Sequence, residues 1–93
     1  MRQVAFHAQA FEQYREWAAR DRKLFERLTK LITEAGRTPF EGTGKPEALK
    51  HELKGCWSRR IDQEHRLVYQ VTDGQLDHGV RILGRVIWIG HSI

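Results

Sequence analysis

The sequence is poor in cysteine and lacks long apolar runs. Cys56 is the one cysteine among 93 residues, so no disulfide forms within the chain, which is typical of proteins in a reducing cytosol. No apolar run approaches the ~20 residues that span a bilayer, and no long apolar segment of a signal peptide is visible at the N-terminus. We therefore expect a cytoplasmic protein with no membrane partner.

Patterns of metal ligands and of nucleophiles are missing as well. The single cysteine and the five histidines do not show the spacing of a zinc site. No motif supports a serine or cysteine nucleophile with a catalytic triad. We expect no metal and no cofactor, and we expect Cys56, between Gly55 and Trp57, to be a buried, inert thiol.

The composition indicates one small basic domain spanning residues 1–93. Hydrophobic residues make up 40% of the chain, which is normal for a globular fold and too rich for a disordered one. The formal net charge of +4 at pH 7 favours a polyanionic partner such as nucleic acid, although many ordinary small domains are equally basic.

The N-terminal part of the chain predicts a strand and a helical hairpin. Residues 2–6 alternate as a short strand, and residues 8–19 and 21–35 carry apolar side chains at helical spacing. Asp21 is a candidate N-cap of the second helix, and Gly36 is a candidate C-cap. The apolar stripe of the first helix, which we expect to face the core, consists of Phe11, Tyr14, Trp17 and Ala18.

The rest of the chain predicts a loop followed by strands. Residues 37–46 contain both prolines and form the loop, which Phe40 is expected to anchor to the core. Alternation and turn residues predict strands at 48–53, 57–62, 65–72, 76–83 and 86–89. The fold class is therefore α+β: a β-α-α unit and then antiparallel strands, with the helices on one face of a twisted sheet and the other face open.

Residues 42–69 gather groups that could cleave RNA through its own 2′-hydroxyl. This reaction needs a base for the 2′ proton, a cation for the charge on the phosphorane and an acid for the leaving oxygen. Glu47 is the candidate base, and His91, at the end of the last predicted strand, is a candidate acid. Arg60 and Arg66 lie on strands joined by a short hairpin, so their guanidinium groups can point at one phosphate on the open face.

These residues also have ordinary structural interpretations. Glu47 could be a surface acid of the loop, and a terminal His91 could be idle. The two arginines could form cross-strand pairs with Asp62 and Glu64. Spacing alone leaves both interpretations open.

The residues from 37 to 73, RTPFEGTGKPEALKHELKGCWSRRIDQEHRLVYQVTD, closely resemble the YoeB toxins, a branch of the RelE/ParE superfamily of bacterial type II toxin–antitoxin systems. The preceding strand and helices resemble the family in length and order, and Tyr14, Trp17 and Asp21 look like its scaffold positions. The resemblance implies a small RelE-like microbial-RNase fold. It also implies a ribosome-dependent endoribonuclease, an mRNA interferase, that cuts mRNA in the ribosomal A site without a metal and so inhibits translation.

The resemblance also implies roles for residues of the motif. The Glu of GKPE, here Glu47, is the family's general base, and the Lys of LKH, here Lys50, is a supporting basic residue. The second Arg of WSRRI, here Arg60, and the Arg of EHRLVY, here Arg66, contact the phosphate in the family. We predict that three further basic residues of the motif bind RNA too, namely Lys45, His51 and Arg59.

Partners are implied by the same resemblance. A cognate antitoxin of the YefM type would cover the site with its C-terminal segment, and operator DNA would be bound only through this antitoxin. The 70S ribosome and its mRNA would be the target. Homodimers are common in the family, so a homodimer is a further expectation.

The C-terminus departs from the family pattern, in which a terminal His is the general acid and an aromatic residue beside it stacks on a base. An ungapped match places Gly84 at the His position, whereas His91 comes seven residues later and is not followed by an aromatic residue. Either an insertion around residues 76–85 extends the sheet and His91 takes the role, or the acid is missing. His78 is a third candidate, although it follows the hairpin turn closely, and Trp88 is a candidate for stacking on a base.

The altered tail leaves alternative functions beside the active interferase. One is a protein that binds nucleic acid or the ribosome through its phosphate-binding residues but lacks the general acid. Another is a protein whose main role is pairing with the antitoxin.

Overall fold

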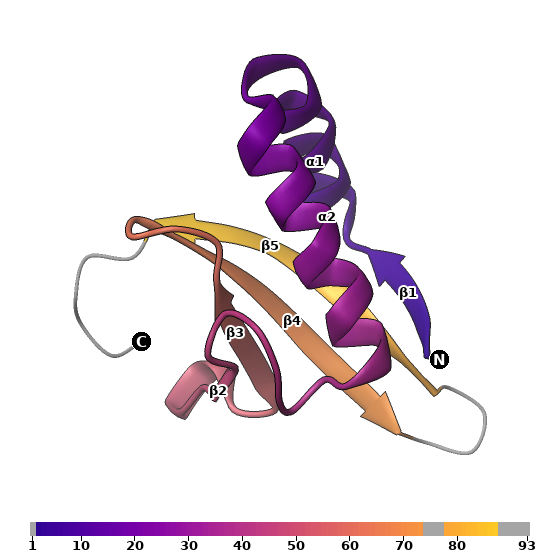
Figure 1. The fold of residues 1–93 in the computed structure, drawn as a ribbon. Coiled ribbons are helices and arrows are strands. Elements are labelled where there is room, and N and C mark those ends of the chain that lie inside the picture. Colours follow the sequence, from indigo (N-terminus) through magenta and orange to yellow (C-terminus); the bar gives the residue numbers. More distant parts are fainter. Residues whose placement is uncertain (1, 74–77, 88–93) are drawn as a thin grey trace.

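The computed structural model describes residues 2–73 and 78–87, and Figure 1 shows how their helices and strands are arranged. The elements, in chain order, are β1 (Gln3–Phe6), α1 (Ala8–Arg20), α2 (Arg22–Arg37), β2 (Glu47–Ala48), the 3-10 helix η1 (His51–Leu53), β3 (Cys56–Arg60), β4 (His65–Asp73) and β5 (His78–Ile87). The two helices form a hairpin that lies between β1 and the remaining strands in the sequence.

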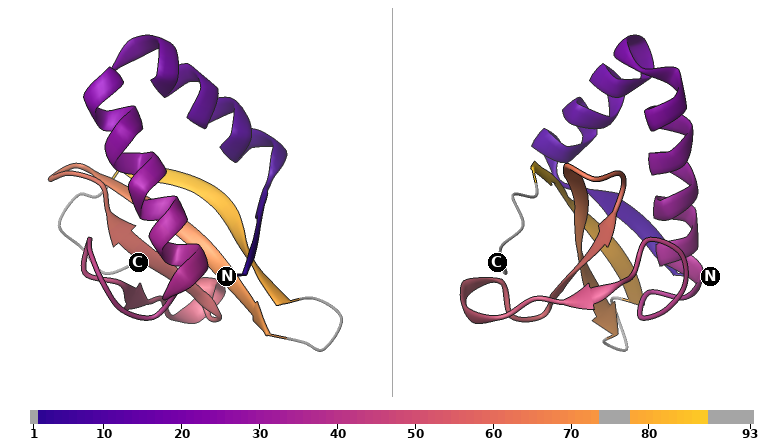
Figure 2. Two further views of the ribbon diagram at one scale, coloured as in Figure 1. Left: turned by 45° about the vertical axis from the view of Figure 1, so that its right-hand side comes forward. Right: turned by 60° about the vertical axis from the view of Figure 1, so that its left-hand side comes forward.

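The strands build one mixed sheet. Within the described residues its order is β1-β5-β4-β3-β2, with β1 parallel to β5 and every other neighbouring pair antiparallel. The helical hairpin lies against one face of the twisted sheet, as Figures 1 and 2 show. The predicted α+β class and the placement of the helices on one face are confirmed. The parallel β1–β5 pair escaped prediction, because alternation within a strand does not reveal its neighbour.

Helix α2 begins as predicted but ends differently. The Asp21 side chain caps the helix by accepting a hydrogen bond from the Leu24 backbone N–H at 3.2 Å. The predicted C-cap is wrong, because Gly36 lies inside the last turn and Thr38 caps the helix. Gly36 is buried there, and its carbonyl accepts a hydrogen bond from the Arg2 N–H at 2.9 Å, which ties the end of the helix to the start of β1.

The apolar stripe of α1 differs in part from the prediction. Tyr14 and Trp17 pack against the core, but Phe11 is 49% exposed, and Ala18 is exposed as well. Ala10, which the prediction omitted, is buried. Helical spacing identifies a broad apolar side of α1, and only packing against the sheet selects the narrower face that is pressed into the core.

The main core lies between the helices and the sheet. Leu67 and Tyr69 of β4 belong to it, whereas Val68 belongs to a cluster on the opposite face, as expected from the alternation of side chains along a strand. The buried residues of the main core are Ala10, Leu28, Leu31, Ile32, Ala35, Ile61, Leu67, Tyr69, Val80 and Ile82.

A second apolar cluster covers part of the face predicted to be open. The predicted strand at 48–53 is wrong beyond Ala48, because the chain turns at His51, whose φ is +58°, and continues as η1. The turn brings Leu49 and Leu53 back over the sheet. The cluster consists of Leu49, Leu53, Cys56, Val68 and Leu83.

Strand β5 runs through the point where a break was predicted, and it contains a bulge there instead. Val68 of β4 is paired with Gly84, and Tyr69 is paired with Ile82, which leaves Leu83 as the extra residue. Gly84 has a φ of +145°, which glycine adopts without the steric cost of a side chain. The bulge lets the strand continue while Leu83 packs in the second cluster.

Candidate active site

Three polar side chains meet on the face of the sheet that the helices leave uncovered. Arg66 Nη1 donates a hydrogen bond to Glu47 Oε2 at 3.2 Å and another to Ser58 Oγ at 3.0 Å. The first contact is also an ion pair, so the structure brings together the predicted base and one predicted phosphate-binding arginine. Sequence reasoning missed Ser58. Its position two residues before Arg60 in one strand was the signal that could have found it.

The strand registers explain why these side chains meet. Glu47 is paired with Ser58 across β2 and β3, and residues directly opposite each other in an antiparallel pair point to the same face. Arg66 is paired with Arg60 across β3 and β4, and Ser58 precedes Arg60 by two residues, on that same face. The short strand β2 is therefore enough to hold the carboxylate beside the arginine.

The two charges of this pair differ in exposure. The Arg66 side chain is 3% exposed, whereas the Glu47 side chain is 54% exposed. A buried guanidinium group requires a hydrogen-bonded counter-charge, and Glu47 supplies it. The carboxylate is thus oriented from the protein side while solvent reaches it from outside. This arrangement suits a group that takes a proton from a bound molecule.

Asp62 belongs to the turn after β3 and does not pair with the arginines as the ordinary interpretation supposed. Its carboxylate accepts hydrogen bonds from the backbone N–H groups of Glu64 and His65 at 2.8 and 2.7 Å and lies 3.0 Å from His65 Nδ1. Burial acts to raise the pKa of Asp62, but the hydrogen bonds from His65 and Glu64 outweigh it, and the pKa is lowered overall.

Backbone strain occurs on both sides of Glu47. Lys45 and His51 have φ values of +52° and +58°, a left-handed conformation that costs a non-glycine residue on the order of 1–3 kcal/mol. Just before Lys45, the Gly44 carbonyl accepts a hydrogen bond from the Arg60 N–H at 2.7 Å. A Cβ atom at Gly44 would lie 3.0 Å from the Arg60 carbonyl oxygen, so this close approach needs glycine. The chain is thereby attached to β3 immediately before the candidate base.

The other predicted basic residues of this segment are accessible. Lys45, Lys50 and His51 are exposed, and Lys50 directly precedes η1. Their contacts with RNA stay predictions.

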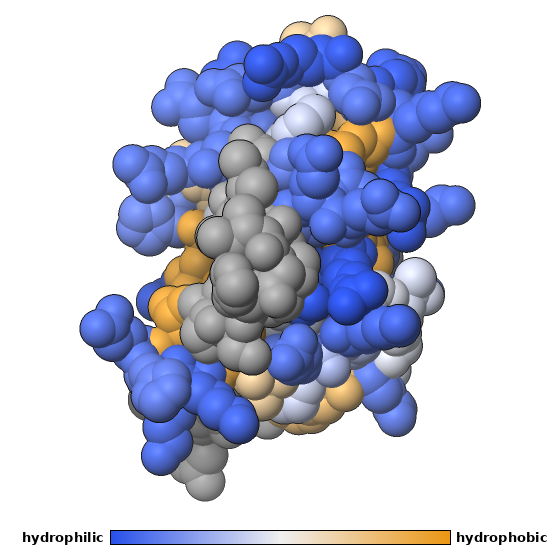
Figure 3. All heavy atoms as spheres, turned by 90° about the vertical axis from the view of Figure 1, so that its left-hand side faces the viewer, coloured by the Kyte–Doolittle hydropathy of each residue, from blue (hydrophilic) through white to orange (hydrophobic). Residues whose placement is uncertain are grey.

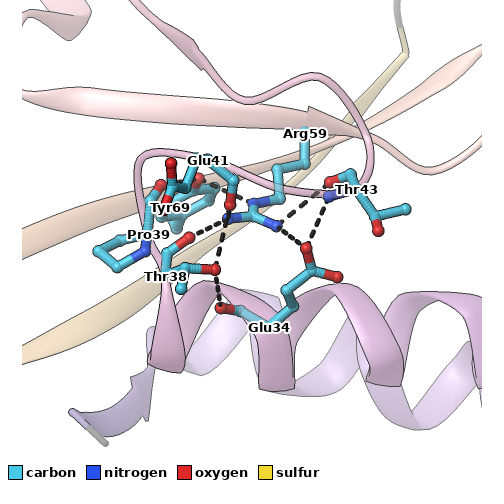
Figure 4. Close-up of polar contacts among 7 residues, drawn as sticks. All are labelled: Glu34, Thr38, Pro39, Glu41, Thr43, Arg59 and Tyr69. Atoms are coloured by element: carbon cyan, nitrogen blue, oxygen red, sulfur yellow. Dashed lines mark hydrogen bonds and ion pairs between the residues drawn. The ribbon is translucent and has the colours of Figure 1, made fainter.

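Arg59 lies on the helix side of the sheet, and the expectation that it binds RNA needs correction (Figure 4). Its side chain is fully buried, and its Nε donates a hydrogen bond to the Tyr69 hydroxyl at 3.0 Å. Its Nη groups donate to the backbone carbonyls of Thr38, Glu41 and Thr43. Strand alternation places Arg59 under α2, where its guanidinium group binds the protein's own loop in place of a phosphate.

Glu34 and Tyr69 complete this arrangement, which we name the Arg59 clamp: Glu34, Arg59, Tyr69 and the loop at residues 38–43. Glu34 lies 3.4 Å from Arg59 Nη1 and accepts a hydrogen bond from the Thr43 N–H at 2.6 Å. The hydrogen bond from Thr43 lowers the pKa of Glu34 in spite of the opposing effect of burial, and burial raises the pKa of Tyr69. The clamp holds the loop that leads to Glu47.

Phe40 does not anchor this loop in the core as predicted. It is 48% exposed, and its ring rests on that of Trp57 with 5.0 Å between the centroids. The neighbouring Pro39 is buried, and its carbonyl accepts a hydrogen bond from the Tyr69 hydroxyl at 2.6 Å. Polar contacts to the backbone, more than the aromatic ring, therefore hold the loop.

The predicted acid and stacking residues, His91 and Trp88, lie outside the described residues, as does the end of the last predicted strand. His78 is the first residue of β5 and is paired with Asp73. Gly84 lies in the bulge of β5. The structure therefore brings together the predicted base and one predicted phosphate-binding arginine, and the acid stays a prediction as well.

Cys56 is buried as predicted. It is 8% exposed, and burial raises the pKa of its thiol; its inertness stays a prediction. Within residues 2–73 and 78–87, no three His, Cys, Asp or Glu side chains are grouped so that they could hold a metal ion. No helix in the described part of the chain is long and apolar enough to cross a membrane.

Comparison with known proteins adds a family to this geometry. Residues 6–80 match the model of the YoeB-like toxin of bacterial type II toxin–antitoxin systems. The toxin YoeB of Streptomyces coelicolor is 52% identical over 73 residues, which are 78% of this chain and 87% of that protein. The match to the family model stops before Gly84, so the unusual tail lies beyond it.

Two solved structures from Staphylococcus aureus share the fold. One is a YoeB–YefM complex, with a TM-score of 0.80 and 36% identity, covering 96% of this chain and 99% of that one. The other is a YoeB dimer, with a TM-score of 0.78 and 38% identity, covering 94% of this chain and 95% of that one. These matches agree with the predicted RelE-like architecture.

Proposed function

Because the chain belongs to the YoeB-like toxins of bacterial type II toxin–antitoxin systems, we propose that it is an endoribonuclease that cleaves mRNA in the ribosomal A site and thereby inhibits translation. The observation that carries this proposal is the contact between Glu47 and Arg66. It joins an exposed carboxylate to a buried guanidinium group, with 3.2 Å between Oε2 and Nη1. Together they form the base and the cation that cleavage through the 2′-hydroxyl requires.

In the proposed reaction, Glu47 removes the proton from the 2′-hydroxyl, and the 2′-oxygen attacks the adjacent phosphorus. The bond from phosphorus to the 5′-oxygen breaks, which leaves a 2′,3′-cyclic phosphate on one product and a 5′-hydroxyl on the other. Arg66 stabilises the negative charge that builds up on the phosphate oxygens, and Arg60 contacts the same phosphate. The reaction needs no redox partner, because only a proton and a phosphoryl bond are exchanged.

The leaving 5′-oxygen requires a proton, and we propose His91 as its donor. An imidazole is suited to this step because its ordinary pKa lies close to neutral pH. Gly84, which an ungapped match puts at the family's His position, has no side chain to donate a proton. Its place in the β5 bulge favours one competing proposal, a homologue that holds RNA or the ribosome but cleaves slowly.

We propose that a YefM-like antitoxin is the protein partner and that it covers the face carrying Glu47 and Arg66. The YoeB–YefM complex from S. aureus supports such a partner, and the S. aureus YoeB dimer supports a homodimer. Operator DNA would be reached through the antitoxin. The 70S ribosome and its mRNA are the proposed target, and the cytoplasm is the proposed location.

The proposal is tested by incubating the purified full chain with 70S ribosomes programmed with mRNA and mapping cleavage by primer extension. We expect cuts in the A-site codon that Glu47→Gln reduces by about 10²–10⁴-fold, the range expected for loss of a general base. Glu52→Gln is the matched control, because Glu52 is an exposed carboxylate in η1 outside the Arg66 contact. Intact mRNA with the wild-type chain would overturn the nuclease proposal.

His91→Gln separates the two competing proposals. If His91 is the acid, this variant loses most of the activity of the wild-type chain and still binds ribosomes. Equal cleavage by wild type and His91→Gln would exclude His91 from the reaction.

A further inference from the structure

A second cationic feature lies at the end of β3, outside the Glu47–Arg66 contact. It is a hollow of about 270 Å³ lined by Arg27, Arg60, Asp62 and Gln63. Arg27 comes from α2 and Arg60 ends β3, so the hollow lies where the helical layer meets the edge of the sheet. Figure 3 looks onto the side of the molecule that lies at the left of Figure 1, and hydrophilic residues make up most of the coloured surface there.

Both arginines of the hollow are available to bind an anion. They are exposed, and neither side chain forms a hydrogen bond or an ion pair with the described residues. Asp62 contributes the one negative charge of the lining, but its carboxylate already accepts hydrogen bonds from the N–H groups of Glu64 and His65. The net character of the hollow is therefore cationic, and Gln63 adds an amide that can donate a hydrogen bond.

The hollow adjoins the candidate active site, because Arg60 of its lining is the ladder partner of Arg66. Arg60 and Arg66 are directly opposite each other in the β3–β4 ladder, and such neighbours have Cβ atoms about 4.5–5.5 Å apart. The Arg60 N–H is bonded to the Gly44 carbonyl, so the backbone at this end of the hollow is held in place. A phosphate in the hollow would therefore be a neighbour of the phosphate bound at Arg66.

We infer that Arg27 binds a phosphodiester of RNA next to the one that is cleaved, with Arg60 lying between the two phosphates and contacting both, so that α2 takes part in substrate binding. This inference rests on the proposed ribonuclease function. Two guanidinium groups facing one hollow suit the oxygens of a phosphate, which accept paired N–H donors. The phosphodiester belongs either to the mRNA strand or to ribosomal RNA at the A site, and these two sources share the same chemistry.

The test measures binding by Arg27→Ala and Arg27→Lys, with Arg15→Ala as the matched control. Arg15 is an exposed arginine of α1 that does not line the hollow, so its removal changes the net charge equally. One probe is a single-stranded, fully 2′-O-methylated RNA, which cannot be cleaved through a 2′-hydroxyl, measured by fluorescence anisotropy over a salt series. The other probe is the 70S ribosome, measured by co-sedimentation.

For Arg27→Ala we expect a loss of affinity of about three- to tenfold at low salt, as for one charge-assisted contact. The slope of log affinity against log salt should fall by about 0.7, the value for one phosphate contact on a single strand. Arg27→Lys should recover part of the affinity, and Arg15→Ala should stay close to wild type. A lower affinity of Arg27→Ala for the oligonucleotide assigns the phosphate to mRNA. A lower affinity for the ribosome alone assigns it to ribosomal RNA.

Equal effects of Arg27→Ala and Arg15→Ala on both probes, or no binding of either probe by the wild-type chain, would overturn the inference. The outcome is separable from the nuclease test. If the wild-type chain cleaves mRNA and Arg27→Ala binds both probes normally, only the inference about Arg27 is contradicted. If the wild-type chain cleaves nothing but needs Arg27 to bind RNA, only the nuclease proposal is contradicted.

Discussion

Two buried arginines on neighbouring strands, Arg59 and Arg66, face opposite sides of the sheet and have different partners. Arg59 is fully buried and binds loop carbonyls, the Tyr69 hydroxyl and Glu34. Arg66 is 2% exposed and binds Ser58 and Glu47, whose carboxylate is half exposed. The acceptors of Arg59 are mainly backbone carbonyls of the loop at residues 38–43, whereas a partner of Arg66 is a solvent-accessible carboxylate.

The comparison teaches that burial of an arginine does not by itself identify its role. The partners do. An arginine whose acceptors are loop carbonyls holds the chain together, because each carbonyl left without a donor would be costly. An arginine that orients an accessible carboxylate prepares a reactive group. The following predictions test this distinction, from the largest expected effect to the smallest.

Arg59→Ala should have the largest effect on stability. Removing the guanidinium group takes one donor from Glu34 and one from each of three loop carbonyls. It also breaks an ion pair whose arginine is fully buried, a change that typically costs about 3–5 kcal/mol. Urea unfolding followed by circular dichroism measures the change. Arg60→Ala, at an exposed position in the same strand, should stay within about 0.5 kcal/mol of wild type. Equal midpoints for the two variants would contradict a structural role of Arg59.

Arg66→Lys should separate activity from stability. A lysine keeps the positive charge beside Glu47, so unfolding should change by about 1–2 kcal/mol, as for a lost hydrogen bond to a charged group. Cleavage of ribosome-bound mRNA should fall about 10²-fold, because a single ammonium group cannot match a planar fork on a phosphate. A loss of stability as large as in Arg59→Ala would mean that Arg66 has a structural role like that of Arg59.

Ser58→Ala should have a smaller effect on both properties. It removes the 3.0 Å hydrogen bond to Arg66 Nη1, worth about 1 kcal/mol of stability. Cleavage should fall less than in Arg66→Lys, because the contact with Glu47 is kept. Ser58→Thr is the companion variant that keeps the hydroxyl group, and equal activity of the alanine and threonine variants would show that this hydroxyl plays no part.

The clamp also predicts a pH dependence of stability. The pKa of Glu34 is lowered in the folded state, chiefly by the hydrogen bond from Thr43. The unfolded state therefore binds more protons on this group, and its contribution to stability is present above the unfolded pKa and lost as pH falls through the folded one. In urea unfolding between pH 6 and 3, wild type should lose more stability than Glu34→Gln. Parallel curves would contradict the prediction.

The smallest expected effect concerns Cys56 in the second apolar cluster. Because burial raises the pKa of this thiol, the folded chain should react with a thiol reagent far more slowly than the urea-unfolded chain. Cys56→Ala should leave cleavage unchanged. Fast labelling of the native chain would show that the cluster opens readily.

Local patterns in the sequence determined much of this protein. Apolar spacing predicted both helices, and alternation in β4 correctly separated Leu67 and Tyr69 from Arg66. These predictions succeed because the periods of a helix and a strand fix which side chains share a face of one element. The motif around Glu47 identified the family in the same way, since it is a property of consecutive residues.

Tertiary structure alone decided which of those faces meet. The contact of Glu47 with Arg66 depends on the register of the two-residue strand β2, and the turn at His51 that shortens this strand was not predicted. Consecutive residues of a strand point to opposite faces, so Arg59 and Arg60 differ in side, yet only the fold showed that the Arg59 face is closed by α2 and a loop. Periodicity within an element is local, whereas register, closure and partners depend on groups that the chain brings together from a distance.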